Sequence, residues 1–356
     1  LLRHDLRTSK SSEIGKGVHH SLCSGQGIIG AIRSGAKTPP QVVVYDKANG
    51  ERKVVSSAGD FSEFGESLIE PEVLRVGNLT VRRYTPANPN GRHLVWVHGG
   101  PTDQWQVVWY PKFNYWLSRG YTIVVPDHRG TTGHGRNFQN ALLGHWGEYD
   151  SNDIAAVIRA LAPQAKAVVG MSLGGLTTLA LARDHAELVR KLVLVDITPG
   201  VNQEKTKQIT DFVNGPATFP SFEELLKRTI EFNPTRTVES LRRGILHNAL
   251  QLDDGSWVWR YRRADAPPLP EMKSAVDEGD KRPSTASLWE AIQHYGKPLM
   301  FVRGMRKQSV VTDEDEAELR KRAGSVRVEH VEEAGHSVQG DTPLELAELI
   351  RDFVGL

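Results

Sequence analysis

Cysteine is almost absent from the sequence: Cys23 is the only one in 356 residues. A lone thiol excludes an internal disulfide, which fits a reducing compartment, so we expect a cytoplasmic protein. An excess of charge of one sign is missing too, because 44 Lys and Arg residues balance 43 Asp and Glu residues. A net charge of +1 gives no indication of a nucleic-acid or membrane partner.

Membrane spans, metal sites and cofactor motifs are also missing. No apolar run is long enough to cross a bilayer, and no Cys/His cluster has the spacing of a metal site. Residues 25–30 match G-x-G-x-x-G, but we see no convincing strand before them. Residues 30–38 resemble a P-loop, but Ala36 separates Gly35 from Lys37. We therefore expect neither a metal nor a cofactor.

Most of the chain shows strands alternating with helices. Strands are predicted at 73–76, 79–84, 93–97, 121–125, 165–169, 191–195, 298–302 and 326–331, and helices at 153–161, 173–183, 313–322 and 344–353. Apolar strands that alternate with helices predict a mostly parallel sheet covered on both faces.

Two segments fall outside this alternation. Residues 1–66 have a weaker, β-rich pattern with short strands at 42–45 and 53–55, and we expect this segment to be loosely attached. Residues 200–295 interrupt the strands for too long to be a loop, so we predict a mainly helical cap on a core formed by 67–199 and 296–356. Part of its apolar side chains would line a ligand pocket: Phe219, Phe222, Leu225, Leu241, Ile245, Trp257 and Trp259.

The strongest motif is G-x-S-x-G at residues 170–174, between a predicted strand and a predicted helix. A nucleophilic serine needs a tight, strained turn that projects its hydroxyl above the sheet, and glycines give that turn room. Ser172 is therefore the candidate nucleophile. The amide of Leu173, at the start of the helix, is a candidate donor to an oxyanion.

Two loops complete the candidate site. His98-Gly99-Gly100-Pro101 follows a strand, and we expect the Gly100 amide to be the second oxyanion donor, with His98 in a structural role. His336 lies in a loop after the last predicted strand, in the chain order that a serine nucleophile and its base follow in such folds. His336 is the candidate base, whereas His330 lies inside the strand and is taken as structural.

These motifs resemble two families of the α/β-hydrolase superfamily. Residues from about 25 to 150 are similar to the prolyl oligopeptidase family, in which a β-propeller precedes the catalytic domain. That similarity rests on SLIEPE (67–72), HGGP (98–101), DHRGTTGHGR (127–136) and WGE (146–148). From about residue 153 the chain resembles capped α/β hydrolases, the group of esterases and ring-fission-product hydrolases, through ALAP (160–163), GMSLGG (170–175), DITPG (196–200), DDGSW (253–257) and GHS (335–337). The resemblance implies an α/β-hydrolase fold, with residues 1–66 as the remnant of one propeller blade.

The acid of the catalytic triad is where the chain departs from these relatives. The resemblance implies a carboxylate after the strand 298–302, yet Lys307 to Ser309 offer none and Asp313 comes a few residues late. The other arrangement in this fold places the acid after the preceding strand, where Asp196 stands. We expect Asp196 to be the acid and keep Asp313 as the alternative.

Together these features predict a serine hydrolase that forms an acyl-enzyme. Its expected substrates are carboxylic esters or, as in the ring-fission group, carbon–carbon bonds of β-diketones. A serine exopeptidase of the prolyl oligopeptidase type and a catalytically inactive binding protein are the alternatives. The expected partner is a small-molecule ester or a short peptide; the sequence leaves the oligomeric state open.

Overall fold

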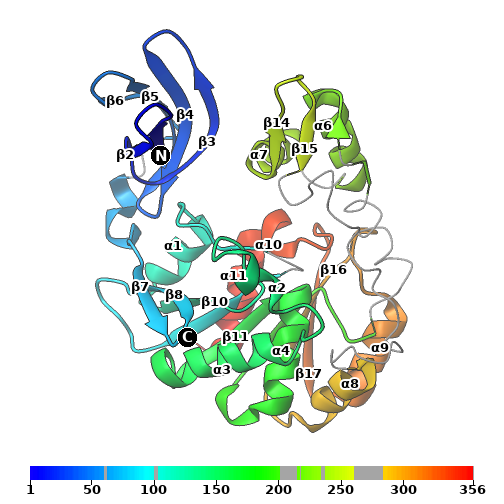
Figure 1. The fold of residues 1–356 in the computed structure, drawn as a ribbon. Coiled ribbons are helices and arrows are strands. Elements are labelled where there is room, and N and C mark those ends of the chain that lie inside the picture. Colours follow the sequence, from blue (N-terminus) through cyan, green and yellow to red (C-terminus); the bar gives the residue numbers. More distant parts are fainter. Residues whose placement is uncertain are drawn as a thin grey trace.

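An eight-stranded sheet forms the centre of the computed structural model, which describes residues 1–59, 62–99, 103–200, 215–216, 218–233, 237–259 and 284–355 (Figure 1). The strand order is β17-β16-β12-β11-β9-β10-β8-β7. Strands from β17 to β10 pair in parallel, and β8 pairs antiparallel with both β10 and β7. The bounds are β7 (Glu72–Val76), β8 (Leu79–Tyr84), β9 (His93–Val97), β10 (Thr122–Asp127), β11 (Ala165–Met171), β12 (Leu192–Val195), β16 (Leu299–Gly304) and β17 (Val326–Val331).

Helices cover both faces of this sheet. Along β9, Leu94 and Trp96 pack in one apolar cluster, while Val95 and Val97 pack in the other, as the two-residue period of a strand requires. Helices α1 (Pro111–Leu117) and α11 (Pro343–Val354) cover the first face. Helices α3 (Tyr149–Leu161), α4 (Leu173–Asp184), α8 (Thr285–His294) and α9 (Asp313–Arg322) cover the second. The predicted α/β-hydrolase architecture is confirmed.

The N-terminal residues form small antiparallel sheets of their own. A ribbon of β1 (Leu2–Asp5) and β2 (Lys10–Glu13) precedes a four-stranded sheet of β3 (Val18–Ser24), β4 (Ile28–Gly35), β5 (Thr38–Asp46) and β6 (Arg52–Ser57). The strands of the four-stranded sheet follow one another in sequence order, and a 3-10 helix, η1 (Ser62–Ser67), leads to the core. The apolar cluster buried in this sheet is small, with Ala31, Val43 and Tyr45 at its centre.

The structure corrects one detail of the sequence analysis. A strand, β3, does precede residues 25–30, where the sequence pattern showed none. The segment still lacks the geometry of a nucleotide site, because it turns into the antiparallel strand β4 rather than into a helix.

The described part of residues 200–295 contains short strands as well as the expected helices. Helices α6 (Phe222–Phe232) and α7 (Val238–Asn248) accompany a sheet of β13 (Thr218–Phe219), β15 (Trp257–Trp259) and β14 (Ala249–Gln251). The Ser221 side chain caps α6 by accepting a hydrogen bond from the Glu224 amide, 3.2 Å away. All seven apolar residues singled out in the sequence pack in the cluster of this segment.

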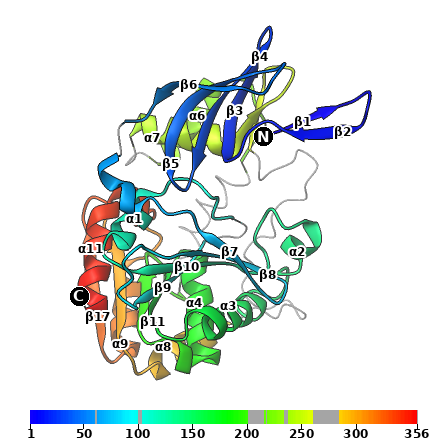
Figure 2. The same ribbon diagram turned by 90° about the vertical axis from the view of Figure 1, so that its left-hand side faces the viewer.

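The segment of α6, α7 and β13 to β15 and the N-terminal sheet lie at the same end of the core (Figures 1 and 2). Helix α7 contacts β3, and the Trp109 amide donates to the Ser34 hydroxyl at 3.2 Å, which joins the N-terminal sheet to the core. Helix α8, within the range expected for the cap, packs instead on α4 and α9. Three short helices complete the described elements: α2 (Arg136–Asn140), η2 (Ala186–Leu188) and α10 (Val338–Asp341). Within the described residues, no helix combines the length and apolarity needed to cross a membrane.

Candidate active site

Ser172 stands at the turn between β11 and α4, where the sequence placed it. Its backbone adopts φ 53° and ψ −131°, a conformation that costs energy for any residue with a side chain. The flanking glycines make the turn possible: a Cβ on Gly170 would overlap the carbonyl of Gly174, and a Cβ on Gly174 would overlap the carbonyl of His98. The turn therefore needs glycine at both positions.

The structure brings Ser172, His336 and Asp196 into one hydrogen-bonded chain. His336 Nε2 lies 3.1 Å from Ser172 Oγ, and His336 Nδ1 lies 2.9 Å from Asp196 Oδ2. These residues come from three separate strand-end loops, after β11, β17 and β12. Because the three strands run parallel in one sheet, their carboxyl ends meet at the same edge of it.

The partners of His336 fix its tautomer. An ionised carboxylate only accepts hydrogen bonds, so Nδ1 of His336 carries the proton and points it at Asp196. Nε2 is then unprotonated and faces the Ser172 hydroxyl, from which it can accept a proton. The Asp196 side chain is fully buried, whereas 23% of the His336 side chain is exposed to solvent.

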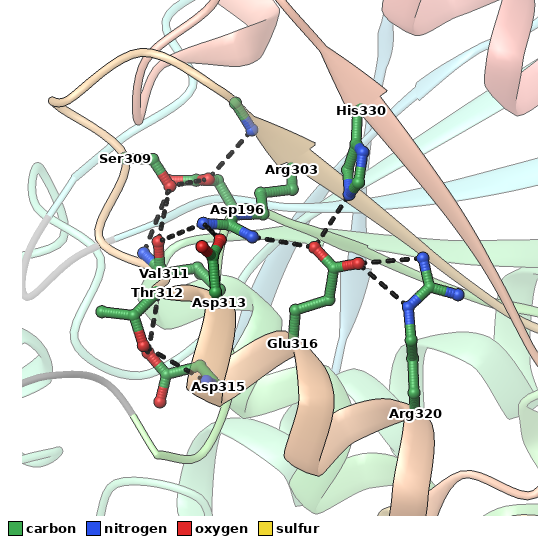
Figure 3. Close-up of polar contacts among 11 residues, drawn as sticks. Asp196, Arg303, Ser309, Val311, Thr312, Asp313, Asp315, Glu316, Arg320 and His330 are labelled. Carbon is green, nitrogen blue, oxygen red and sulfur yellow. Dashed lines mark hydrogen bonds and ion pairs between the residues drawn. The ribbon is translucent and has the colours of Figure 1, made fainter.

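Asp196 also lies in an unusual backbone conformation, with φ 48° directly after β12. Its Oδ1 accepts hydrogen bonds from the Gly304 amide at 3.0 Å and the Ser309 hydroxyl at 2.6 Å (Figure 3). Its Oδ2 accepts from the Val310 amide at 3.1 Å as well as from His336. Gly304 is the last residue of β16, and Ser309 and Val310 lie in the loop after it, where the sequence offers no carboxylate at the expected place.

Asp313, the alternative acid, occupies a different environment. It is the first residue of α9, as the sequence predicted, and its side chain is 87% exposed. Its carboxylate pairs with Arg303 at 2.8 Å (Figure 3). The hydrogen bond of His336 Nδ1 goes to Asp196 instead.

Of the two candidate oxyanion donors, one lies within the described residues and the other does not. Leu173 is the first residue of α4, so its amide belongs to the N-terminal end of that helix, where anions are stabilised. Gly100 lies outside the described residues. Next to it, the ring of His98 approaches the Gly99 carbonyl at 2.6 Å and the Thr131 hydroxyl at 2.8 Å. Because a carbonyl only accepts, Nδ1 donates to Gly99 and Nε2 accepts from Thr131.

His98 stacks on the ring of His128 with 4.4 Å between the ring centroids. Burial, together with the neighbouring imidazole, lowers the pKa of His98 to about 4. The ring is therefore neutral near pH 7. Its contacts hold the start of the glycine-rich loop, which is the structural role that the sequence predicted.

Sequence reasoning missed a cluster of charged side chains next to the loop after β16. Glu316 accepts hydrogen bonds from Arg303 at 2.9 Å, Arg320 at 2.9 Å and His330 at 2.8 Å (Figure 3). Burial alone would raise the pKa of Glu316, but these three donors lower it to about 2. No sequence motif could reveal this cluster, because its members come from β16, α9 and β17.

A buried carboxylate on α3 was also missed. Asp150 accepts from the Gly147 amide at 2.6 Å and from the Thr177 hydroxyl at 2.7 Å, on the nucleophile helix α4. Burial raises its pKa. Asp150 thus ties α3 to the helix that begins directly after Ser172. Among the described residues, no group of three or more His, Cys, Asp or Glu side chains could hold a metal ion.

Comparison with known proteins places this site in a family. Residues 92–343 match the model of the alpha/beta hydrolase fold. Esterase Rv0045c from Mycobacterium tuberculosis is 37% identical over 292 residues, which cover 79% of this chain and 88% of that esterase. A solved structure of the same esterase matches 83% of this chain and 99% of its own, with a TM-score of 0.55 and 33% identity.

A peptidase is similar in fold. The structure of a puromycin-hydrolyzing peptidase from Mycobacterium tuberculosis matches 99% of this chain but 49% of its own, with a TM-score of 0.66 and 18% identity. At that identity the likeness shows the fold alone. The resemblance to esterases drawn from the sequence is thus matched by a relative, whereas the peptidase matches in fold.

Proposed function

Since the chain belongs to the alpha/beta hydrolase fold family, we propose that it is a serine esterase that cleaves small carboxylic esters through an acyl-enzyme. One observation carries the proposal: the continuous hydrogen-bonded chain from Ser172 Oγ through the His336 ring to the buried Asp196 carboxylate. This is the arrangement that turns a weakly nucleophilic hydroxyl into an effective nucleophile.

The reaction follows from the tautomer of His336. Ser172 Oγ attacks the ester carbonyl while His336 Nε2 takes its proton, and Asp196 stabilises the imidazolium that forms. The amides of Leu173 and, in our prediction, Gly100 bind the oxyanion. Nε2 then returns the proton to the leaving alcohol, and the acyl group stays on Ser172. Water next attacks this ester by the same steps in reverse order and releases the acid.

The similarity to an esterase supports an ester rather than a peptide bond as the substrate. A similar protein, of which this chain covers 88%, is called an esterase, whereas the peptidase resembles the chain at only 18% identity. A peptidase and a β-diketone hydrolase would use the same acyl-enzyme chemistry, so the preference concerns the substrate and not the nucleophile.

We further propose that the segment of residues 200–295 provides the apolar wall of the acyl site. Helices α6 and α7 and strands β13 to β15 share a buried apolar cluster, against which the partly buried Phe222, Ile230 and Trp257 pack. It lies at the same end of the core as the N-terminal sheet (Figure 1). An apolar acyl chain would gain from burial against these partly buried side chains.

Two substrate series, each of which releases a coloured nitroaromatic product, test the proposal. Short-chain p-nitrophenyl esters and aminoacyl p-nitroanilides are compared by kcat/KM, each corrected for its rate of spontaneous hydrolysis. We expect the esters to be turned over faster and Ser172→Ala to abolish that turnover. Faster corrected turnover of the anilides would replace the esterase proposal by the exopeptidase alternative. Ester turnover unchanged in Ser172→Ala would reject Ser172 as the nucleophile.

A further inference from the structure

The loop after β16 contains no carboxylate at the position that the family resemblance implied, yet it contacts the triad acid directly. Ser309 lies in this loop, and 3% of its surface is exposed. Its hydroxyl oxygen is 2.6 Å from Asp196 Oδ1, the carboxylate oxygen opposite the one that binds His336. A hydroxyl thus stands where an acid was expected, and it meets the acid that comes from the neighbouring strand (Figure 3).

The neighbours of Ser309 settle the direction of its hydrogen bond. The Val311 amide donates to Ser309 Oγ at 3.2 Å, and an amide cannot accept. The Asp196 carboxylate accepts at 2.6 Å, whereas the other acceptor near the hydroxyl, the Val311 carbonyl, lies 3.4 Å away. The single hydroxyl proton of Ser309 therefore points at Oδ1. A hydrogen bond from a hydroxyl to a carboxylate is charge-assisted and among the stronger ones in proteins.

The loop after β16 is in turn held in place by a cluster of charged side chains. The Arg303 guanidinium donates to the Val311 carbonyl at 3.3 Å and to Glu316 at 2.9 Å. Glu316 is buried and pairs with Arg320 and His330 as well. This cluster limits how far the loop can move, so the hydroxyl of Ser309 is presented to Asp196 from a fixed position.

We propose that Ser309 is a positioning residue for the reaction: its hydroxyl holds the Asp196 carboxylate so that Oδ2 faces His336 Nδ1. The inference rests on the proposed function, in which Asp196 is the triad acid. When the hydroxyl is removed, Asp196 keeps the Gly304 amide on Oδ1 and the Val310 amide on Oδ2. The hydroxyl makes the shortest of these contacts, at 2.6 Å, so its loss leaves the carboxylate less firmly held in the orientation that keeps Oδ2 on the imidazole through catalysis.

A double-mutant cycle on the full chain tests the inference. Ser309→Ala, Asp196→Asn and the double variant are assayed with p-nitrophenyl acetate, and Lys307→Ala, an exposed residue of the same loop, is the control. We expect Ser309→Ala to lower kcat about tenfold, the loss typical of one hydrogen bond to a charged group, with little change in KM. Lys307→Ala should behave as wild type.

The cycle separates positioning from a merely structural role. If Ser309 acts through Asp196, its removal costs nothing more once Asp196→Asn has been made, so the double variant matches Asp196→Asn. Additive losses, or a Ser309→Ala variant as active as wild type, would overturn the inference. Should Ser309→Ala fail to fold, Ser309→Cys keeps the space with a weaker donor and is expected to lower kcat in the same way; wild-type activity there would reject the inference. Wild-type protein without ester turnover would reject the proposed function itself.

Discussion

Gly174→Ala tests the packing on which the nucleophile turn depends. An added Cβ would overlap the His98 carbonyl oxygen and would lie 2.9 Å from His98 C and 3.0 Å from Val97 O, all of them backbone atoms. Backbone cannot rotate away as a side chain can, so α4 and the end of β9 must separate. Overpacking of this kind costs about 1–3 kcal/mol, and the better helix propensity of alanine returns at most about 1 kcal/mol.

The consequence for activity should exceed that for stability. Ser172 precedes Gly174 by two residues, and His98 begins the loop that carries the predicted donor Gly100. Pushing the two segments apart misplaces the nucleophile relative to the oxyanion donors. A misplacement of about 1 Å can lower turnover about a hundredfold, so we expect kcat/KM for p-nitrophenyl acetate to fall by about that factor.

Gly244→Ala is the matched control, because the same substitution in α7 meets no atom within 4 Å. It should leave activity unchanged and raise the melting temperature slightly, since alanine favours a helix. Both variants are compared by thermal unfolding and ester turnover. If Gly174→Ala keeps wild-type turnover, or if Gly244→Ala loses as much, the steric account of the turn is wrong.

Three further predictions concern the acid, the buried cluster and the N-terminus. Asp196→Asn should lower kcat by about 10⁴, the cost of a wrong tautomer, while Asp313→Asn stays near wild type; the reverse order would make Asp313 the acid. Glu316 has a pKa of about 2 in the fold against a usual value of 4.5, so its stabilising effect is complete above pH 4.5 and is lost as the pH falls toward 2. Urea unfolding of Glu316→Gln should therefore show a smaller loss of stability over that range than wild type, and parallel pH dependences would contradict this. Limited proteolysis should cut first within residues 1–66, whose buried apolar cluster is small; a first cut in the core would argue against loose attachment.

The core could be predicted from sequence because its strands are buried runs bounded by clear turns. Every strand predicted from residue 73 onward appears at its place, and Asp313 begins a helix as expected. Strands β1 to β4 were missed: β1 to β3 are mostly exposed and show no clear alternation, and glycines interrupt the apolar pattern of β4. The short strands β13 to β15 have two or three residues each, too few to show a period.

The candidate site was predictable in its members but not in its support. Ser172, His336 and Asp196 each follow a strand, and parallel strands bring such positions together. Ser309 and Glu316 carry no motif: their roles depend on which side chains from other strands meet them. The packing of α8 on α4 was equally hidden, because an amphipathic pattern shows that a helix is buried but not against what.

Covalent labelling by a fluorophosphonate tests the central claim most directly. The reagent reacts with a serine only when a base activates its hydroxyl, so it reports the chain from Ser172 through His336 to Asp196 without reference to any substrate. Peptide mapping after labelling should place one adduct on Ser172 in wild-type protein, and none in Ser172→Ala or His336→Ala. Folded wild-type protein that remains unlabelled, or an adduct on another serine, would contradict the account and favour a binding protein on this fold.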